Sequence, residues 1–445
     1  MIDRIARDYL PAALLVLGLL LGGSSSGGAL ANAVLQILTL LAASLVFLTY
    51  QGRRFPRALA GIVLLICALP LIQLIPLPPS LWTELPAREP IRRGFELASQ
   101  PLPWLPLTLD QDATLAVIVA LIPAGAMLVV TLSASARGLV LAMWGALLIA
   151  GCSVLLGLAQ RLAGEGGGLQ VYDLTNPGMA VGLFANRNHL GTLLVMAMPL
   201  ATVLLVDLQR RWLVFAALAF LGLGAALTGS DAALLLALGV GGLCLISVLA
   251  WPRARRVWLA LVLVAVTFVA AAAVWQVRQD STADTPGVAE QHRPFIVGTT
   301  MRAAADHFPV GSGGGSFPRI YPRYEDPGQA SPEYVSHAHS DYAEVLLEYG
   351  LPGGLAIAAV IGWLGYAALG LWRSPAMAGS AWAGLVMLGV ALAHSLVDYP
   401  LRTAAIAMLA AFAAGLLHRT EPRPSDPLGG NHEHPADEGH ARFSL

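Results

Sequence analysis

The sequence contains no lysine, so all 26 of its basic residues are arginine. The absence of lysine excludes every mechanism that needs a lysine nucleophile or a lysine Schiff base. Charge of either sign is scarce, because charged residues make up 12 % of the 445 residues, roughly half the share of an ordinary soluble domain. With 56 % hydrophobic residues, the chain cannot cover itself with polar surface, which excludes a soluble globular enzyme.

Cysteine is also rare in the sequence. Cys67, Cys152 and Cys244 lie within apolar runs, and their spacing fits neither a metal site nor a disulfide framework. We interpret them as small core residues. The net charge of −1 provides no basic surface, so the sequence predicts no nucleic-acid partner.

Long apolar runs fill most of the chain. A helix needs about 20 apolar residues to cross the hydrocarbon core of a bilayer. Twelve runs approach that length: 10–28, 29–50, 58–76, 113–133, 138–160, 184–206, 212–228, 232–250, 257–275, 350–372, 380–398 and 402–418. The sequence therefore predicts an all-α integral membrane protein with about 12 transmembrane helices.

The arginines between these runs indicate the orientation of the chain. Every second connection is short and basic, with these arginines: Arg53, Arg54, Arg57, Arg137, Arg210, Arg211, Arg253, Arg255, Arg256 and Arg373. Short basic loops face the cytoplasm. Both termini are then cytoplasmic, and the long connections face outward.

The start of the chain allows two interpretations. Arg4, Arg7 and the apolar stretch 10–21 resemble a signal peptide with a cleavage site near 29–31. An uncleaved first helix fits better, because another apolar run follows at once. Cleavage would leave the orientation of the remaining helices unchanged.

The longest outer connection, 276–336, is rich in arginine. It contains Arg278, Arg293, Arg302, Arg319 and Arg323. Long loops are exempt from the inside bias of arginine, so these side chains are either simply solvated or form an anion site. Arginine suits phosphate oxygens, because its planar guanidinium donates two parallel hydrogen bonds.

A glycine-rich segment follows within the same connection. Glycine or serine occupies every position from 311 to 316, which makes Gly313 and Ser316 candidates for anion binding through exposed backbone N–H groups. A flexible turn is the alternative.

Two histidines precede an expected helix. Ser340 or Asp341 is suited to cap its start, and Gly350 is suited to break it. His339 then lies just ahead of a positive helix end, which keeps its imidazole neutral. A neutral imidazole accepts a proton, so His339 is a candidate general base. Two alternatives remain: a pair of structural histidines at the interface, or a metal site formed by His337, His339, Asp341 and Glu344.

Further polar groups lie at three sites on the outer side of the apolar runs. They are Asn186, Arg187, Asn188 and His189, then Ser230 and Asp231, then His394, Asp398 and Arg402. Polar groups at membrane depth are costly unless they line a functional site. Helix capping is the alternative for each group alone, but capping gives no reason for all of them to fall on the outer side.

Four motifs occur in order between residues 182 and 417. They are 182–191 (Gly-Leu-Phe-Ala-Asn-Arg-Asn-His-Leu-Gly), 308–317 (Phe-Pro-Val-Gly to Phe), the His339-Ser340 pair with nine residues before Gly350, and 397–401 (Val-Asp-Tyr-Pro-Leu). In their order and spacing on a chain of about 12 spans, they resemble the bacterial O-antigen ligase and O-antigen polymerase superfamily.

This resemblance implies a GT-C-like membrane fold whose active site faces the periplasm and uses neither a metal nor another cofactor. The family's essential histidine corresponds to His339, and its loop arginine to Arg302. Members carry Ser-Arg after the seventh span, where this sequence has Ser230-Asp231. Arg187, Arg293 and Arg402 are candidates to replace the missing charge.

The apolar runs, the long outer connection and the polar end of the sequence predict a division of the chain. We expect transmembrane helices one to nine in 1–275, a periplasmic loop with the catalytic motif in 276–349, helices ten to twelve in 350–420, and a disordered cytoplasmic tail in 421–445. The histidines of the tail leave a metal site as the alternative to a solvated segment.

The resemblance thus implies an inverting glycosyltransferase of the bacterial inner membrane. It also implies an undecaprenyl-diphosphate-linked glycan as the donor and a polysaccharide or the lipid A core as the acceptor. The expected catalytic residues are His339 and Arg302. The expected substrate-binding residues are Asn186, Arg187, Asn188, Arg293, Gly313, Ser316, Arg319, His337, Asp341, Glu344, Asp398 and Arg402. A lipid-glycan flippase or another transporter is the alternative.

Overall fold

The computed structural model describes residues 2–25, 28–49, 55–164, 167–249, 293–327, 334–373 and 379–418. The long helices are α1 (Ile2–Leu21), α2 (Ala29–Thr49), α3 (Arg57–Gln73), α6 (Gln111–Ser133), α7 (Ala136–Ala163), α8 (Arg187–Asp207), α9 (Arg211–Leu227), α10 (Asp231–Val248), α12 (Arg293–Asp306), α14 (Asp341–Arg373), α15 (Gly379–His394) and α16 (Ala404–Leu417). The shorter elements are β1 (Pro76–Leu77), α4 (Pro79–Trp82), α5 (Glu89–Leu97), β2 (Leu105–Pro106), α13 (Phe317–Ile320), η1 (Tyr321–Arg323) and η2 (Pro400–Arg402).

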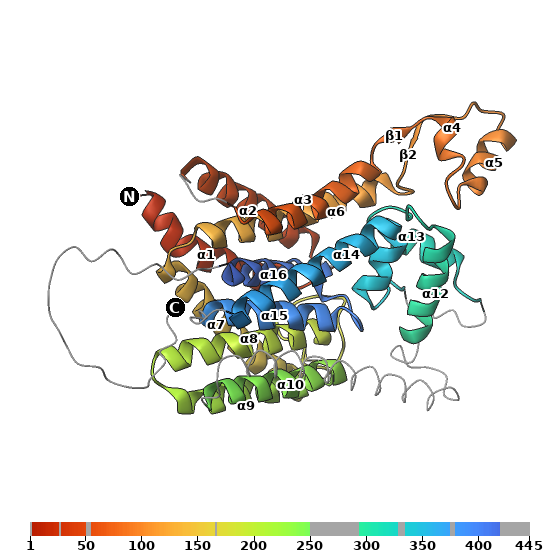
Figure 1. Cartoon of the computed structure of the whole chain (residues 1–445). Coiled ribbons are helices and arrows are strands. Elements are labelled where there is room, and N and C mark those ends of the chain that lie inside the picture. Colours follow the sequence, from red (N-terminus) through yellow and green to blue (C-terminus); the bar gives the residue numbers. More distant parts are fainter. Residues whose placement is uncertain are drawn as a thin grey trace.

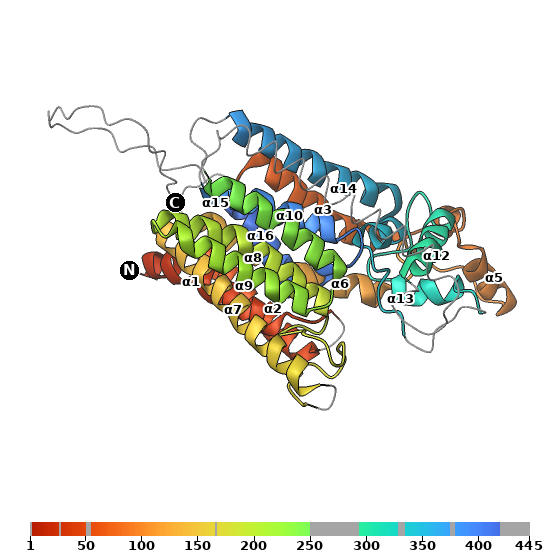
Figure 2. The ribbon, with the colours of Figure 1, turned by 90° about the horizontal axis from the view of Figure 1, so that it is seen from below.

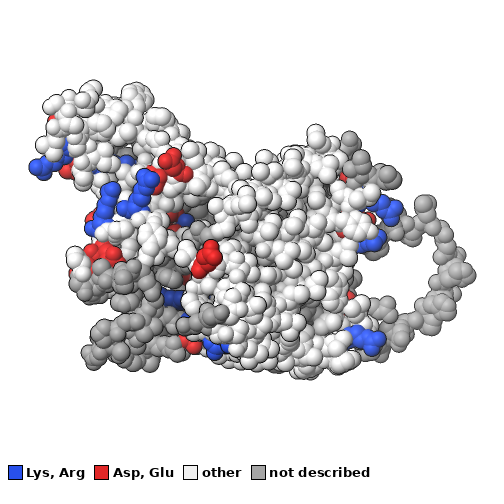
Figure 3. Space-filling model, turned by 180° about the vertical axis from the view of Figure 1, so that it is seen from behind, with Lys and Arg blue, Asp and Glu red and all other residues white. Residues whose placement is uncertain are grey.

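The described helices support the prediction of an all-α membrane protein. Six of them are long and apolar enough to cross a bilayer, namely α2, α6, α7, α8, α10 and α14, while α3, α9, α15 and α16 are shorter apolar helices. A broad band across the middle of the face in Figure 3 shows no charged side chain, and arginines gather toward the two ends. The expected span 257–275 and the tail 421–445 lie outside the described residues.

Helix α8 forms the centre of the bundle. It is apolar on all sides after its first turn, and such a helix is stable only when neighbours surround it. Nearly all of it is buried, and it packs against α7, α9, α10 and α15. Figures 1 and 2 show α12, α13, α4 and α5 together at one end of the bundle, while the start of α1 lies at the other end.

A break in α14 connects the bundle to the glycine-rich segment. Gly350 has φ +56° and ψ −137°, so the regular hydrogen-bond pattern of the helix stops there. The carbonyl oxygens of Leu347 and Glu348 then need other donors. They accept hydrogen bonds from the backbone N–H groups of Ser312 (2.9 Å) and Gly313 (2.9 Å).

The end of α3 and the start of α6 hold the glycine-rich segment from its other side. Gln73 donates from Nε2 to the carbonyl of Glu348 (2.8 Å) and accepts at Oε1 from the N–H of Gly314 (2.9 Å). Thr114 Oγ1 donates to the carbonyl of Gly314 at 2.9 Å.

The glycine-rich segment therefore has a structural role in place of the expected anion site. The N–H groups of Gly311, Ser312, Gly313 and Gly314 all donate to groups within the protein, so they do not face a ligand. Ser316 Oγ is buried and lies 2.6 Å from Ser312 Oγ. The close approach of three backbone segments explains why glycine is needed: a Cβ on Gly313 would overlap Thr108.

Substituting Gly350 by alanine should destabilise the protein. A side chain at this φ and ψ costs about 1–3 kcal/mol in backbone strain, and the new Cβ would overlap the carbonyl oxygen of Pro309. Gly362→Ala in the same helix is the matched control, since its Cβ would meet nothing within 4 Å. Thermal unfolding of the purified protein in detergent should show a lower midpoint for Gly350→Ala and no loss for Gly362→Ala. Equal midpoints would contradict this account of the break.

Candidate active site

Polar side chains from distant parts of the chain converge where α8 and α14 begin and α15 ends. Helix caps position two of these starts. Asn186 Oδ1 accepts from the N–H of Asn188 at 2.8 Å, and Ser340 Oγ accepts from the N–H of Ala343 at 3.4 Å. The N–H of Asp341 donates to the carbonyl of Ser395 at 2.9 Å, which joins the start of α14 to the segment that follows α15.

Tyr399 lies at the centre of this group. The centroid of its ring lies 4.3 Å from that of His337, 5.3 Å from that of His339 and 5.1 Å from that of His189. Asn186 Nδ2 reaches its hydroxyl at 3.5 Å. One tyrosine thus brings His189 together with His337 and His339, which lie far from it in the sequence.

His339 faces a carboxylate. Its Nδ1 lies 3.6 Å from Asp398 Oδ1, and its side chain is 23 % exposed while that of Asp398 is 1 % exposed. Its backbone has φ +52°, a left-handed conformation that is uncommon for a residue other than glycine. Such conformations are often found at functional sites, where the surrounding structure holds them.

The surroundings keep His339 neutral and Asp398 charged. Burial lowers the pKa of His339 below its ordinary value of 6.5; the nearby Asp398 opposes this shift, and Arg293 adds to it. Burial by itself raises the pKa of Asp398, but contact with His339 and the charge of Arg293 hold that pKa well below its ordinary value. A neutral imidazole beside a carboxylate is the arrangement of a general base with an orienting partner.

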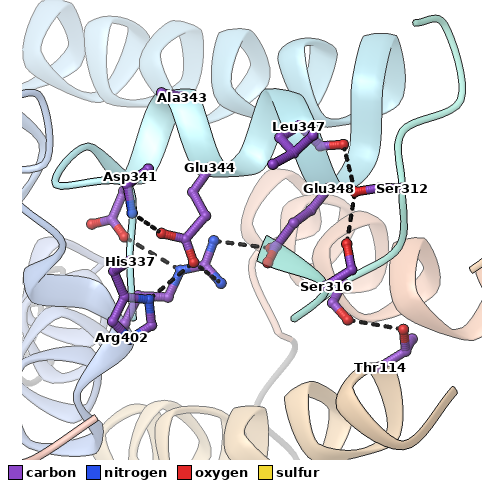
Figure 4. A network of polar contacts seen from close by, with 12 residues as sticks. Thr114, Ser312, Ser316, His337, Asp341, Ala343, Glu344, Leu347, Glu348 and Arg402 are labelled. Carbon is purple, nitrogen blue, oxygen red and sulfur yellow. Dashed lines mark hydrogen bonds and ion pairs between the residues drawn. The ribbon is translucent and has the colours of Figure 1, made fainter. Parts of the chain in front are cut away.

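Arg402 lies among three carboxylates of α14 (Figure 4). Its Nε is 3.5 Å from Asp341 Oδ1, its Nη1 is 3.3 Å from Glu344 Oε1, and its Nη2 is 3.0 Å from Glu348 Oε2. Burial opposes its charge, but these three carboxylates hold the pKa of Arg402 well above its ordinary value. The sequence had suggested that Arg402 faces a phosphate of the substrate. In the structure its guanidinium is paired with carboxylates within the protein instead.

The carboxylates at the start of α14 orient a different histidine from the one expected. Glu344 Oε1 lies 3.0 Å from His337 Nδ1, and its Oε2 accepts from the N–H of Ala338 at 2.9 Å. Asp341 Oδ2 accepts from Ser395 Oγ at 2.7 Å. Asp398, and neither Glu344 nor Asp341, is the partner of His339.

The structure also changes the choice of arginine on α12. Arg302 is exposed, and its Nη2 donates to Thr299 Oγ1 at 2.8 Å. Arg293 lies nine residues earlier, about two and a half turns, and so on the opposite side of the helix. The charge of Arg293 acts on His339, Asp398 and His394. Arg293, and not Arg302, is the arginine of α12 that borders the site.

Two further expected arginines have separate positions. Arg319 pairs with Asp110 at 2.8 Å, away from the histidines. Arg187 Nη1 lies 3.2 Å from where a Cβ of Gly229 would be, next to the turn that holds Ser230 and Asp231. Its charge interacts with those of Arg293, Asp231 and Asp398. Of the three candidates to replace the missing charge, Arg187 is the one that reaches this turn.

The alternative of a metal site finds no support in the described part of the chain. Among the residues that the structure describes, no three His, Cys, Asp or Glu side chains are arranged to hold a metal ion. Of the four side chains considered for it, His337 pairs with Glu344, while His339 faces Asp398 and Asp341 accepts from Ser395 Oγ.

Sequence reasoning missed two members of the site. Tyr399 was part of a quoted motif but had no assigned role. Glu348 follows Asp341 and Glu344 at helical spacing, so the three carboxylates form one stripe of α14. That spacing, in an otherwise apolar helix, was the available signal for a buried cation nearby.

Comparison with known proteins identifies the domain that contains much of this site. Residues 216–358 match the family described as O-antigen ligase. The resemblance to the O-antigen ligase and polymerase superfamily is confirmed. The matched segment includes Arg293, His339 and the carboxylate stripe of α14, whereas the start of α8 and the segment around Asp398 lie outside it. No curated protein matches the chain.

The family match and the helices together define the coarse character of the protein. An O-antigen ligase domain indicates an enzyme with a ligase or polymerase role in glycan transfer. Six helices able to cross a membrane indicate a multi-pass membrane protein. The substrates of the family are, in general, lipid-linked glycans and their polysaccharide or lipid A-core acceptors.

Replacing Arg402 by methionine should destabilise the protein in a pH-dependent way. Removing one partner of a buried ion pair costs about 3–5 kcal/mol, because uncompensated charge remains buried. The loss should be larger at pH 8 than at pH 5, since carboxylates that have lost their counter-charge take up protons as the pH falls and become neutral. Unfolding midpoints across this pH range measure the effect.

Arg302→Met is the control for this substitution, because it removes an exposed arginine of α12. A second variant carrying both Arg402→Met and Glu348→Leu should recover part of the lost stability. An Arg402→Met protein as stable as the wild type at pH 8 would show that the three ion pairs contribute little.

Proposed function

We propose that this protein is a metal-independent, inverting glycosyltransferase of the bacterial inner membrane with its active site on the periplasmic side. It transfers a glycan from undecaprenyl diphosphate to an acceptor hydroxyl. The observation that carries this proposal is the partly exposed His339, which faces Asp398 and lies within the field of Arg293 at the polar end of an apolar helix bundle. The O-antigen ligase family match supports the same reaction class.

His339 acts as the general base. Its Nδ1 faces Asp398, so Nε2 is the ring nitrogen left to receive the proton of the acceptor hydroxyl. As that proton moves to Nε2, the hydroxyl oxygen forms a bond to the anomeric carbon of the donor sugar. The bond from this carbon to the diphosphate oxygen breaks on the opposite face, and the configuration inverts. Asp398 stabilises the imidazolium that forms.

Arg293 and Arg187 stabilise the leaving diphosphate. Their charges act on each other, so the two guanidinium groups lie close enough to repel. An anion between them removes this repulsion and accepts hydrogen bonds from both. Because negative charge grows on the diphosphate as the bond breaks, this interaction strengthens in the transition state and speeds the reaction.

The remaining site residues surround the sugar and the base. Asn186 is half-buried beside Tyr399, which suits contact with sugar hydroxyls. His337, partly exposed and held by Glu344, borders the same space. Membrane lipids surround the apolar helices, and the polyprenyl tail of the donor lies among them.

Of three acceptors that carry a hydroxyl, a polysaccharide, the lipid A core and a protein serine or threonine, we favour the first two. A polymerase adds the glycan to a growing polysaccharide, and a ligase adds it to the lipid A core. A flippase or another transporter is the competing function, since it would also bind a lipid-linked glycan among membrane helices.

Alanine at position 339 should abolish glycan transfer while the protein still inserts into membranes. Loss of a general base lowers a rate by roughly 10²–10⁴-fold. The measurement is product formation by purified protein reconstituted with the lipid-linked donor and either acceptor. Normal turnover by His339→Ala would reject the proposed base. Movement of the donor across the bilayer without a new glycosidic bond would assign the protein to the transporters.

Arginine substitutions on α12 separate the two candidate residues. Arg293→Gln should lower the rate of transfer by about 10²–10³-fold, the usual cost of removing one group that stabilises transition-state charge. Arg302→Gln is the matched control, since it removes the same charge from the opposite side of the same helix, and it should keep nearly full activity. The reverse pattern would return the leaving-group role to Arg302.

A further inference from the structure

A group of buried polar atoms lies behind Asp398, between the start of α8 and the end of α15. Among the described residues, five of these atoms have no hydrogen-bond partner within the protein: Asn188 Nδ2, both ring nitrogens of His189, His394 Nε2 and Asp398 Oδ2. The four residues are at most 3 % exposed. An unsatisfied buried polar group is costly, so several in one place require an explanation.

These atoms belong to one neighbourhood. The charge of Asp398 acts on His189, and the ring of His189 lies edge-on to Tyr399. Helices α8 and α15 pack against each other, and His394 Nδ1 lies 2.8 Å from Thr192 Oγ1, one turn along α8 from Asn188. The group therefore adjoins the catalytic pair on its buried side.

The hydrogen bonds of Thr192 determine which nitrogen of His394 is an acceptor. With its one hydrogen assigned to the carbonyl of Asn188 at 3.0 Å, the Thr192 hydroxyl accepts from His394 Nδ1. A neutral His394 then carries its hydrogen on Nδ1, and Nε2 presents a lone pair. Asp398 Oδ2 is a second acceptor, the Asn188 amide is a donor, and His189 supplies one of each.

A buried site that offers both hydrogen-bond donors and hydrogen-bond acceptors is suited to bind water. A buried water makes about three hydrogen bonds to groups that otherwise lack partners, and it needs both kinds. Asp398 Oδ1 faces His339 and accepts a hydrogen bond from the N–H of Tyr399 at 2.9 Å. Its other oxygen, Oδ2, can therefore accept a hydrogen bond on the buried side without disturbing the contact with His339.

We propose that ordered water joins His189, Asn188 and His394 to Asp398 Oδ2 and fixes the carboxylate in the orientation that supports His339. His189 and His394 are then positioning residues for glycan transfer, acting through Asp398 without touching substrate. This inference rests on the proposed function of His339 as the base.

The pH dependence of transfer reports on this arrangement. The charged and titratable groups that face His339 are Asp398 after α15, Arg293 on α12, and the histidines His337 and His189. If the hydrogen bonds to Asp398 Oδ2 are lost, Asp398 stabilises the imidazolium of His339 less. The pKa of His339, which governs the acid limb of the pH profile, then moves further down. General loosening that admits solvent would instead move that pKa up toward the ordinary value of 6.5.

The test uses full-length protein reconstituted with donor and acceptor, and it measures kcat, KM and the acid limb of the pH profile. His394→Leu and His189→Leu should each lower kcat roughly tenfold to a hundredfold, leave KM unchanged and shift the acid limb to lower pH. His394→Gln should recover much of the rate, because its amide oxygen can accept where Nε2 did. His418→Leu is the matched control, since His418 also has a buried Nε2 without a partner but caps the far end of α16, and it should behave as the wild type.

Three results would overturn the inference. They are wild-type kinetics in both leucine variants, an acid limb that moves up, and equal loss in His418→Leu. If a leucine variant does not accumulate, Thr192→Val decides, because it keeps the side-chain volume, removes the hydroxyl that holds His394 and should shift kcat and the acid limb in the same direction. Failure of the proposed function looks different: His339→Ala would then be active, or the wild type would form no glycosidic bond.

Discussion

The contact between Arg402 and three carboxylates is the constraint on which the rest of the site depends. Charges are expensive to bury, and an arginine within an apolar bundle is retained only where carboxylates compensate it. Asp341, Glu344 and Glu348 lie on one stripe of α14, and Arg402 comes from the connection between α15 and α16. The ion pairs of Arg402 therefore hold these two segments together, and each segment carries one member of the candidate catalytic pair. His339 lies two residues before the start of α14, and Asp398 lies four residues before Arg402.

The two neighbouring histidines of the motif face different carboxylates. His337 pairs with Glu344, which also contacts Arg402, so this histidine is part of the structural network. His339 faces Asp398, remains partly exposed and has a left-handed backbone. The ring of Tyr399 lies against both imidazole rings.

Backbone hydrogen bonding explains the glycine-rich segment. The break at Gly350 frees two carbonyl oxygens of α14, and the N–H groups of Ser312 and Gly313 satisfy them. The same N–H groups, seen in the sequence alone, suggested an anion site. A glycine-rich loop exposes donors in either case, and the difference lies in whether an acceptor from the protein is already there.

The sequence by itself determined the membrane class and the family, and it drew attention to the segment around His339 as the expected site. Apolar runs and helix caps are local properties, so the start of α14 at Asp341 and the break at Gly350 could be predicted from neighbouring residues. The pairing of side chains was decided by tertiary structure alone. Which carboxylate faces His339, which arginine of α12 points toward it, and whether Arg402 meets a phosphate or three carboxylates all depend on how helices far apart in the chain rotate against one another. About two and a half turns of α12 separate Arg293 from Arg302 and place them on opposite sides, and no pattern along the chain states which side of that helix faces the histidines.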